Sequence, residues 1–478
     1  MSLRKEGTSA IAWSLGDKFL KRGVRFVLSI FLARLLTPSD FGVVAMASIF
    51  VSWAEVFRDF GMGQAIIQDK DVTDTQTSTV FYINLFMGVL IALIFVLIAP
   101  WASRFYDNKM VAWVVRVAGL TFIITSLNVV QFSLFVKALN YKVGTIASFL
   151  ASTVSGILGI AMAFMGFGVW SLLAQSVMSS VITTGYVWFK SKWRPKRLFN
   201  FKETRPLFIK GVGFMGQGLV DNVFNSLGSM VIGKAFSPAM LGLFSRGHDL
   251  ATMPETTLIA PITRPLFPIF AKIKDKEELR RYYIRTLEML NWAMIFVCGL
   301  LLLCSDEIIL IMYGIQWVES APFLFLLSLL IPFVPYWTTT TALWKAIGHV
   351  KEVALLTFVD KFLAFLSIIA LFHSIKLYAI MLIVSFFLAN VIKTRINIRI
   401  MKMSLWEQYR EWFMDMAIMV VAVLLISRLV IDSTVLSFVL KSVSFILVYW
   451  ALSSLLKIKG MHTLVYLAKD SIITFRKK

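Results

Sequence analysis

The sequence predicts an all-α polytopic membrane protein with about fourteen transmembrane helices. This prediction rests on the composition, the length of the apolar stretches and the distribution of the basic residues. Of the 478 residues, 58% are hydrophobic, and 41 Phe stand against only 27 Asp and Glu combined. A water-exposed surface cannot be built from that composition. The net charge of +21 would suggest nucleic-acid binding in a soluble protein, but here the basic residues must first be assigned to loops or helices.

The apolar stretches are each long enough to cross a bilayer as a helix, which takes about 20 residues. Their ends are defined only to within several residues. The predicted membrane helices are 11–36, 41–65, 77–99, 110–136, 144–165, 168–189, 207–235, 240–268, 286–303, 320–344, 352–372, 377–392, 412–431 and 435–455.

The basic residues orient the chain with both termini in the cytoplasm. The segment 190–206, the connection 270–285 and the C-terminal tail are rich in Lys and Arg, whereas the predicted external connections contain only Arg104, Lys109 and Lys376. We therefore interpret the basic loops as charge beside anionic headgroups rather than as a nucleic-acid surface. The longest external connection is 304–319, which is short for a catalytic segment.

The chain offers little for metal or covalent chemistry. Cys298 and Cys304 are the only cysteines and lie in an apolar run, and the four histidines are scattered. We expect no disulfide, metal site or cofactor. A cleavable signal peptide is not expected either, because charged residues interrupt the first apolar stretch.

An internal repeat appears at an offset of 200 residues. The segment 32–42 (LARLLTPSDFG) aligns with 232–242 (IGKAFSPAMLG), and both contain a basic residue, a Thr/Ser-Pro pair and a final glycine. A proline after Ser or Thr ends one helix and begins the next, so each copy predicts a tight external hairpin. Chance similarity between apolar segments is the alternative, but the polar positions in register favour duplication.

Six predicted helices separate the two copies, so both halves would enter the membrane in the same direction, related by an axis along the membrane normal. The predicted domains are an N-terminal lobe (1–190), a basic cytoplasmic linker (191–206), a C-terminal lobe (207–402), and a C-terminal helix pair with a basic tail (403–478). Each lobe would contain six helices. Transporters of this plan bind substrate between their halves.

Basic residues inside the first predicted helix are the main functional signal. Lys18, Lys21, Arg22 and Arg25 fall within an arc of about 100° on a helix. Each would cost about 3 kcal/mol at the bilayer centre. The arc is therefore expected to face water, a carboxylate or an anionic substrate, and Asp17 can pair with Lys21 one turn away. Snorkelling from the cytoplasmic end of the helix is the alternative.

The repeat-related helix 207–235 also has a polar stripe. Gln217, Asp221 and Asn225 share an arc of about 80° with Lys210. Shifted by 200 positions, three charged residues of the first helix fall on them. Both stripes are then expected to face one central cavity, with interhelical hydrogen bonding as the alternative.

Two further helices contain charged residues. Helix 41–65 contains Glu55 and Arg58, and Arg58 can be neutralised by Glu55 on the same face. Helix 240–268 contains Arg246, Glu255 and Arg264, and its prolines predict an irregular helix.

Three motifs resemble a known family. The segments 7–13 (GTSAIAW), 33–42 (ARLLTPSDFG) and 60–65 (FGMGQA) are similar to those of bacterial polysaccharide exporters. The similarity is to Wzx-type flippases of the colanic-acid and teichuronic-acid exporter branch, in the multidrug/oligosaccharidyl-lipid/polysaccharide flippase superfamily. It is strongest over 1–70 and recurs at 205–270.

The resemblance implies a transporter, not an enzyme. Its substrate would be an undecaprenyl-diphosphate-linked oligosaccharide, moved across the bacterial cytoplasmic (inner) membrane by alternating access through a cationic central cavity. A coupling proton or sodium ion and a polysaccharide polymerase are the other expected partners, with no nucleic acid. By role, the residues expected to bind substrate are Lys18, Lys21, Arg22, Arg25, Gln217, Asn225, Arg246 and Arg264. Those expected to hold a coupling ion are Asp17, Asp221 and Glu255.

Two other functions compete with this one. A drug or cation antiporter of the same superfamily should have a carboxylate-rich cavity, whereas the first helix here is rich in cations. A membrane polymerase or ligase acting on the same lipid carriers would need a larger external segment than this chain offers.

Overall fold

The computed structural model describes residues 23–466 except residues 25, 59, 70 and 430, and it does not describe the side chains of 213–221. The structure is 86% helical, and no strand occurs among the described residues. The all-α prediction is thus confirmed. The chain divides into two compact units, Met1–Gly242 and Leu243–Lys478.

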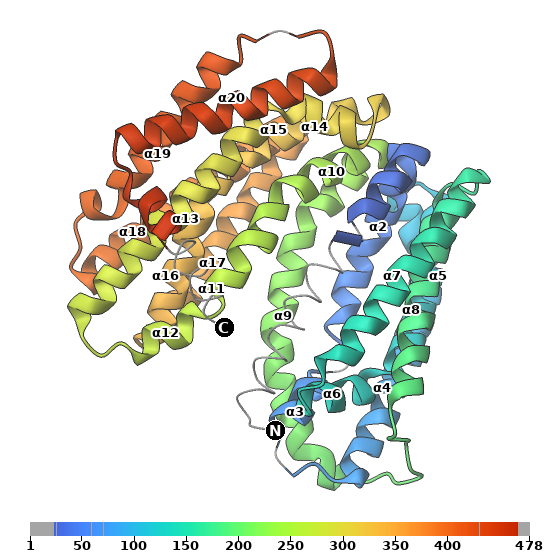
Figure 1. The fold of residues 1–478 in the computed structure, drawn as a ribbon. Coiled ribbons are helices and arrows are strands. Elements are labelled where there is room, and N and C mark those ends of the chain that lie inside the picture. Colours follow the sequence, from blue (N-terminus) through green and yellow to red (C-terminus); the bar gives the residue numbers. More distant parts are fainter. Residues whose placement is uncertain (1–22, 25, 59, 70, 430, 467–478) are drawn as a thin grey trace, which may run out of the picture. The chain divides into compact units, whose positions relative to one another are not determined.

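The first unit is built from antiparallel helices joined by short connections (Figure 1). Its N-terminal described helix is Phe26–Leu35. The following helices are α2 (Pro38–Glu55), α3 (Met62–Gln68), α4 (Asp74–Tyr106), α5 (Lys109–Ser126), α6 (Val129–Lys137), α7 (Tyr141–Phe164), α8 (Val169–Lys190) and α9 (Phe201–Ala235). Helix α4 packs along α5, and α7 packs along α8.

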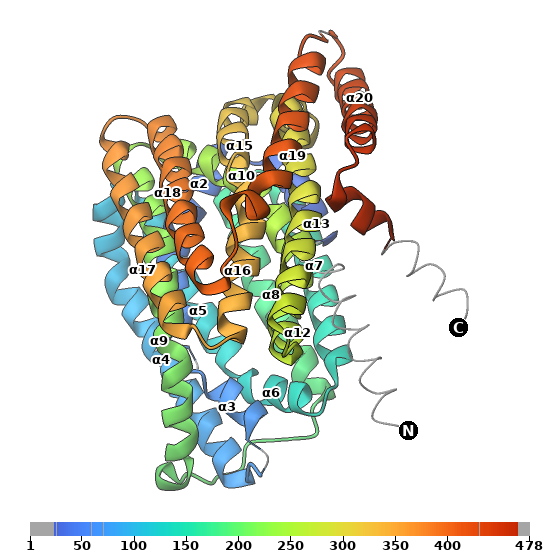
Figure 2. The ribbon, with the colours of Figure 1, turned by 90° about the vertical axis from the view of Figure 1, so that its left-hand side faces the viewer.

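The second unit begins within α10 (Pro238–Pro254), which continues into a π-helical turn at Glu255–Ile259. Figure 2 shows α17 and α18 side by side, and α19 packs on both α13 and α20. The remaining elements are α11 (Ala260–Thr263), α12 (Leu266–Lys272), α13 (Lys276–Leu303), α14 (Ser305–Met312), α15 (Ala321–Ser328), α16 (Val334–Ala346), α17 (Val350–Ser367), α18 (Ile375–Met401), α19 (Leu405–Ile426) and α20 (Thr434–Leu455), with short 3-10 turns at Ile315–Ser320, Ile331–Phe333 and Ile368–Phe372.

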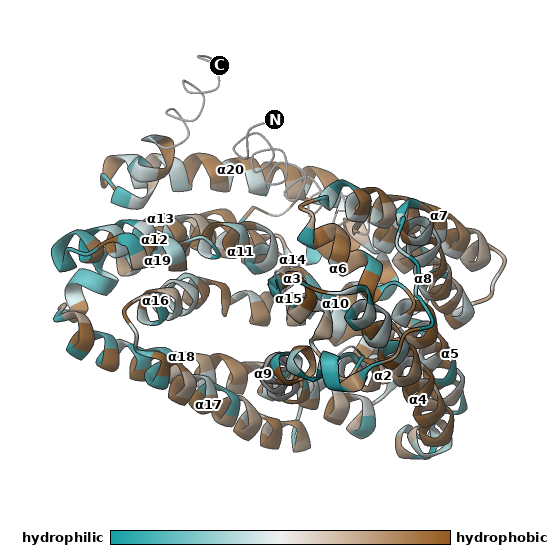
Figure 3. Cartoon of the chain, turned by 90° about the horizontal axis from the view of Figure 1, so that it is seen from below, coloured by the Kyte–Doolittle hydropathy of each residue, from teal (hydrophilic) through white to brown (hydrophobic). Residues whose placement is uncertain are grey.

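Eight helical segments of the described chain are long and apolar enough to cross a membrane. Helix α4 is largely brown, the hydrophobic end of the scale, in Figure 3. Its side chains Phe86 and Leu97 are 65% and 77% exposed, as expected of a surface that faces lipid. The predicted count of fourteen spans is not confirmed. Two predicted spans are interrupted: 41–65 breaks between α2 and α3, and 110–136 breaks between α5 and α6.

Helix starts are specified by capping residues. Thr37 accepts a hydrogen bond from the backbone N–H of Asp40, and the Asp40 carboxylate accepts one from the backbone N–H of Thr37. Thr73 and Gln76 form the same reciprocal arrangement at the start of α4. These bonds satisfy backbone donors that a helix start leaves without intrahelical partners.

The two copies of the repeated motif contact each other within the first unit. A Cβ added to Gly42 would lie 1.6 Å from the carbonyl oxygen of Pro238, and one added to Gly242 would lie 2.0 Å from that of Pro38. Only glycine lets two backbones approach this closely. The contact is reciprocal, as a two-fold relation between the copies requires, and this agrees with the predicted duplication.

The predicted linker 191–206 is fastened to the start of α4. The backbone N–H of Lys196 donates to Ser78 (3.1 Å), and that of Asn200 donates to Thr79 (2.9 Å). The ammonium of Lys196 lies 2.5 Å from the carboxylate of Asp74. Helix α9 then begins inside the predicted linker, at Phe201, and packs against α2, α3 and α4. The compact units and the predicted lobes are different divisions of the chain, so the lobe boundaries stay a prediction.

Candidate functional site

A cavity of about 270 Å³ lies in the first unit, next to α7 and α8. Most of its lining side chains bear a hydroxyl or an amide, although the surrounding helices are apolar. The lining residues are Leu28, Ser152, Ser155, Leu172, Gln175, Ser176, Ser179 and Ser180. Such a lining can donate and accept hydrogen bonds at several points of one ligand.

Helical spacing brings these serines together. Ser176, Ser179 and Ser180 stand at positions i, i+3 and i+4 of α8, and Ser152 and Ser155 stand three apart on α7, so each set shares one face. Ser152 and Ser155 are only 5% and 1% exposed. The Ser155 hydroxyl donates to the backbone carbonyl of Ser152 at 3.5 Å. The Ser152 hydroxyl makes no hydrogen bond within the described chain, so it is available to a ligand.

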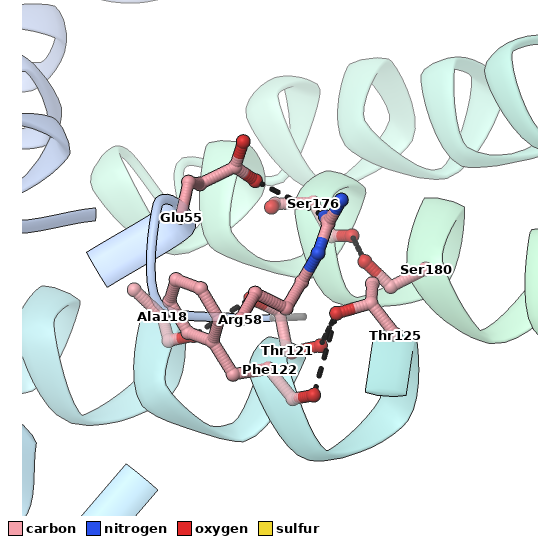
Figure 4. Close-up of polar contacts among 8 residues, drawn as sticks. All are labelled: Glu55, Arg58, Ala118, Thr121, Phe122, Thr125, Ser176 and Ser180. Carbon is pink, nitrogen blue, oxygen red and sulfur yellow. Dashed lines mark hydrogen bonds and ion pairs between the residues drawn. The ribbon is translucent and has the colours of Figure 1, made fainter. Parts of the chain in front are cut away.

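Arg58 lies beside this cavity. It follows the end of α2, and Figure 4 shows its guanidinium pointing toward Ser176 and Ser180, with Thr121 and Thr125 of α5 alongside. Ser176 and Ser180, toward which Arg58 points, are also two of the serines that line the cavity. The cavity and the cation form one site, which we call the Arg58 site: Arg58 and the residues that line the cavity.

Few of the donors of Arg58 are used. Its Nη1 lies 3.4 Å from Oε1 of Glu55, a long contact between side chains that are 34% and 54% exposed. Its Nε is buried and has no hydrogen-bond partner in the described structure. A guanidinium has five N–H donors in a planar fork that matches phosphate and carboxylate groups. The Arg58 site thus combines spare cationic donors with neutral hydroxyls.

The predicted cluster of the first helix lies outside the described residues. This applies to Asp17, Lys18, Lys21, Arg22 and Arg25. The prediction that these side chains face a common cavity is therefore not tested.

The second predicted stripe lies on α9. Gln217 and Asp221 lie within α9, but the structure does not describe their side chains. Asn225 is exposed and has an interaction partner. The role of this stripe also stays a prediction.

The candidates after residue 240 lie apart from the Arg58 site in the chain and belong to the second unit. Arg246 is 3.8 Å from Asp249, and its guanidinium carbon is 5.9 Å from the ring centre of Tyr313. Glu255 is half-buried at the start of the π-helical turn, which confirms the predicted irregularity of 240–268. Arg264 is exposed, and no ion pair joins it to another described residue. No hydrogen bond or ion pair links these candidates in the described part of the chain.

Sequence reasoning missed most of the Arg58 site. It noted Arg58 only as a charge that Glu55 could neutralise, and it ignored the serines. The signal that could have found them is the spacing of Ser176, Ser179 and Ser180 on an otherwise apolar helix. Within the described ranges, no group of three or more His, Cys, Asp or Glu side chains could hold a metal ion.

The chain is similar to a protein family, to individual relatives and to a solved structure. The family described as polysaccharide biosynthesis protein matches residues 31–322. The succinoglycan biosynthesis transport protein ExoT of Rhizobium meliloti is 25% identical, covering 70% of this chain and 69% of its own length. The teichuronic acid biosynthesis protein TuaB of Bacillus subtilis is 24% identical, covering 69% and 68%. The fold is shared with the lipid II flippase MurJ in its inward closed conformation, at TM-score 0.74 and 14% identity, covering 93% of this chain and 98% of that one.

Proposed function

The chain belongs to the family of polysaccharide biosynthesis proteins, and we propose that it is a flippase for a lipid-linked oligosaccharide. The relatives named above are a succinoglycan transport protein and a teichuronic acid biosynthesis protein. The proposed substrate is carried from the inner to the outer leaflet of the bacterial cytoplasmic membrane. The family resemblance predicted from the motifs of 1–70 is confirmed.

The Arg58 site is the observation that supports this proposal most directly. A lipid-linked oligosaccharide has an anionic phosphate link and a glycan rich in hydroxyls. The guanidinium of Arg58 suits the phosphate, and the serines of α7 and α8 suit the glycan hydroxyls. A charged side chain in a membrane protein that is only loosely paired is a functional signal in its own right.

The residues that line the site favour transport of an anionic substrate over transport of a cation. Glu55 is the one carboxylate that pairs with Arg58 among the described residues, and the cavity lining contains none. A drug or cation antiporter would need acidic side chains where this cavity has hydroxyls. A drug-efflux assay on cells that express the protein tests that alternative, and no added resistance is expected.

The predicted basic arc extends the proposal. Leu28, a cavity-lining residue, lies in the predicted helix 11–36, of which the structure describes Phe26–Leu35. If the predicted helix is continuous, Lys21 and Arg25 precede Leu28 by less than two turns. We propose that these cations and Arg58 bind the same anionic link of the substrate. The proposal has further parts. It includes alternating access, cytoplasmic termini and a polymerase partner. It also assigns ion coupling to Asp17, Asp221 and Glu255.

The test is export by cells whose own copy of the protein is replaced by variants. Arg58→Ala should lower polymer export roughly 10- to 100-fold and leave lipid-linked units on the cytoplasmic side, because a charge-assisted contact contributes about 1.5–3 kcal/mol. Arg58→Lys should be intermediate, since it keeps the charge but not the planar fork.

Arg104→Ala is the matched control. Arg104 is an exposed arginine in the last turn of α4 with no ion pair to any described residue. Normal export by Arg58→Ala, at a membrane level equal to that of the control, would remove the basis for the proposed substrate site.

A further inference from the structure

Three carboxylates meet between α13 and α19 in the second unit. Glu411 and Asp415 stand one turn apart on α19, and Glu288 lies on α13, which packs against α19. Both Glu288 and Glu411 are near enough to interact electrostatically with Asp415. The cluster is far from the predicted ion-coupling residues in the sequence.

The three side chains differ in their partners. Oε2 of Glu411 accepts a hydrogen bond of 3.2 Å from the backbone N–H of Lys459. Oε1 of Glu288 lies 4.0 Å from the ammonium of Lys459. Asp415 is fully buried, and both of its carboxyl oxygens lack a hydrogen-bond partner among the described residues. Asp415 is thus the innermost and least satisfied member.

The groups around Asp415 do not supply a counter-charge. The hydroxyl of Tyr449, on α20, is used in a hydrogen bond of 3.1 Å to the carbonyl of Trp292. The indole N–H of Trp292 is used in a bond of 3.0 Å to Ser453. The thiol of Cys298, on α13, donates to the carbonyl of Ser328. The cations near the cluster, Arg285, Arg410 and Lys459, interact electrostatically with Glu288.

A carboxylate cannot remain ionised in such a place without a large penalty. An unpaired buried charge costs several kcal/mol even after relaxation, and two neighbouring carboxylates add repulsion. A bound cation removes both the cost of the unpaired charge and the repulsion between the carboxylates. A metal ion does not fit, because no group of three or more ligating side chains with metal-binding geometry exists in the described chain. A proton needs only one oxygen.

We propose that Asp415 is a proton-binding site, and that Glu411 and Glu288 exchange its proton with water near Lys459. Release breaks the O–H bond of the Asp415 carboxyl and forms one on the carboxylate of Glu411. The proton then passes to Glu288 or directly to water, which leaves Asp415 ionised. The outward path is short, because Glu288 is 13% exposed and Lys459 is 61% exposed. Coupling of this proton to substrate movement rests on the proposed function, whereas proton binding by Asp415 does not.

Infrared spectroscopy of the full-length protein in lipid bilayers tests proton binding. At neutral pH the wild type should show the carbonyl band of a protonated carboxyl group, and Asp415→Asn should lose it. Asp107→Asn is the matched control: Asp107 is exposed, and its left-handed conformation (φ 50°) is one that Asn tolerates, so its band should equal that of the wild type. An undiminished band in Asp415→Asn overturns the proposal.

A second measurement needs no variant. Dicyclohexylcarbodiimide reacts with protonated carboxyl groups in apolar surroundings, so mass spectrometry of the labelled wild type should place the adduct on Asp415. An adduct confined to other carboxyl groups contradicts the proposal, whether or not the variant folds.

Export assays separate this proposal from the proposed function. Asp415→Asn should abolish the dependence of export on a transmembrane proton gradient. If the infrared band is lost while export and its dependence on the gradient are unchanged, the proton has no role in transport and the coupling is wrong. If Arg58→Ala exports normally while the band behaves as expected, the proposed function fails and the proton site stands.

Discussion

Substitution of Gly42 by Ala tests the contact between the two copies of the repeated motif. The added Cβ would lie 1.6 Å from the carbonyl oxygen of Pro238, with the carbonyl carbon at 2.3 Å and Cα at 2.9 Å. All three neighbours are backbone atoms, so no side chain can rotate away. A Cβ needs about 3 Å from such atoms, and the two backbones must therefore separate by more than 1 Å. Their separation also weakens the packing around Gly242, on the other side of the same contact.

Overpacking of this kind costs about 1–3 kcal/mol, and we expect the upper end of that range because rigid backbone is involved. Thermal unfolding of the detergent-solubilised protein measures it, since each kcal/mol lowers Tm by roughly 2–4 °C in domains of this size. Gly242→Ala, with its closest contact at 2.0 Å, should be destabilising as well.

Gly185→Ala is the matched control for Gly42→Ala. Gly185 lies within α8, and an added Cβ meets no atom within 4 Å. Alanine is the better helix former by about 1 kcal/mol, so this variant should melt at or above the wild-type temperature. Equal melting temperatures for Gly42→Ala and Gly185→Ala would refute the close contact between the two copies.

Two ion pairs give further predictions, each measured by thermal unfolding. The hydrogen bond from Lys210, together with the backbone N–H of Asp71, holds the pKa of Asp69 below its ordinary value of 3.8. At neutral pH, Asp69→Asn should therefore lower the free energy of unfolding by about 0.2–1 kcal/mol relative to the wild type. This difference should disappear as the pH falls through the lowered pKa of Asp69. A difference that stays constant down to that pH would contradict the prediction. Lys441 and Glu307 pair at 2.5 Å with side chains only 16% and 9% exposed, so Lys441→Met alone should cost about 3–5 kcal/mol. The double variant with Glu307→Gln should recover most of that loss, and additive losses would show that the two groups do not interact.

Most of the helices could be predicted from the sequence because membrane helices need long apolar stretches. The predicted spans 144–165 and 168–189 correspond to α7 and α8 with small shifts at the ends. The breaks inside other spans could not be seen, because they leave the apolar pattern intact. Gly61 adopts a left-handed conformation (φ 68°) between α2 and α3, yet one glycine in an apolar run is no reliable signal of a break.

The candidate site was harder to predict than the fold. Serines in membrane helices usually bond to the backbone of their own helix, as Ser148 does to Gly144 and Ser180 to Ser176, so their presence alone indicates no site. What distinguishes the Arg58 site is the meeting of serine faces from two helices beside an arginine that follows the end of a third helix. That meeting depends on how the helices pack, which the order of residues along the chain does not show.

The attachment of residues 191–206 to α4 has a practical consequence for dividing the protein. The predicted duplication invites expression of the chain as two separate halves, cut in the polar connection between them. Such a cut would separate α9 from α2, α3 and α4, against which it packs. It would also disrupt the hydrogen bonds that the backbone N–H groups of Lys196 and Asn200 donate to α4. The first fragment would then expose an apolar surface that α9 normally covers. Fragments meant to reassemble should therefore keep α9 in one piece with the helices against which it packs.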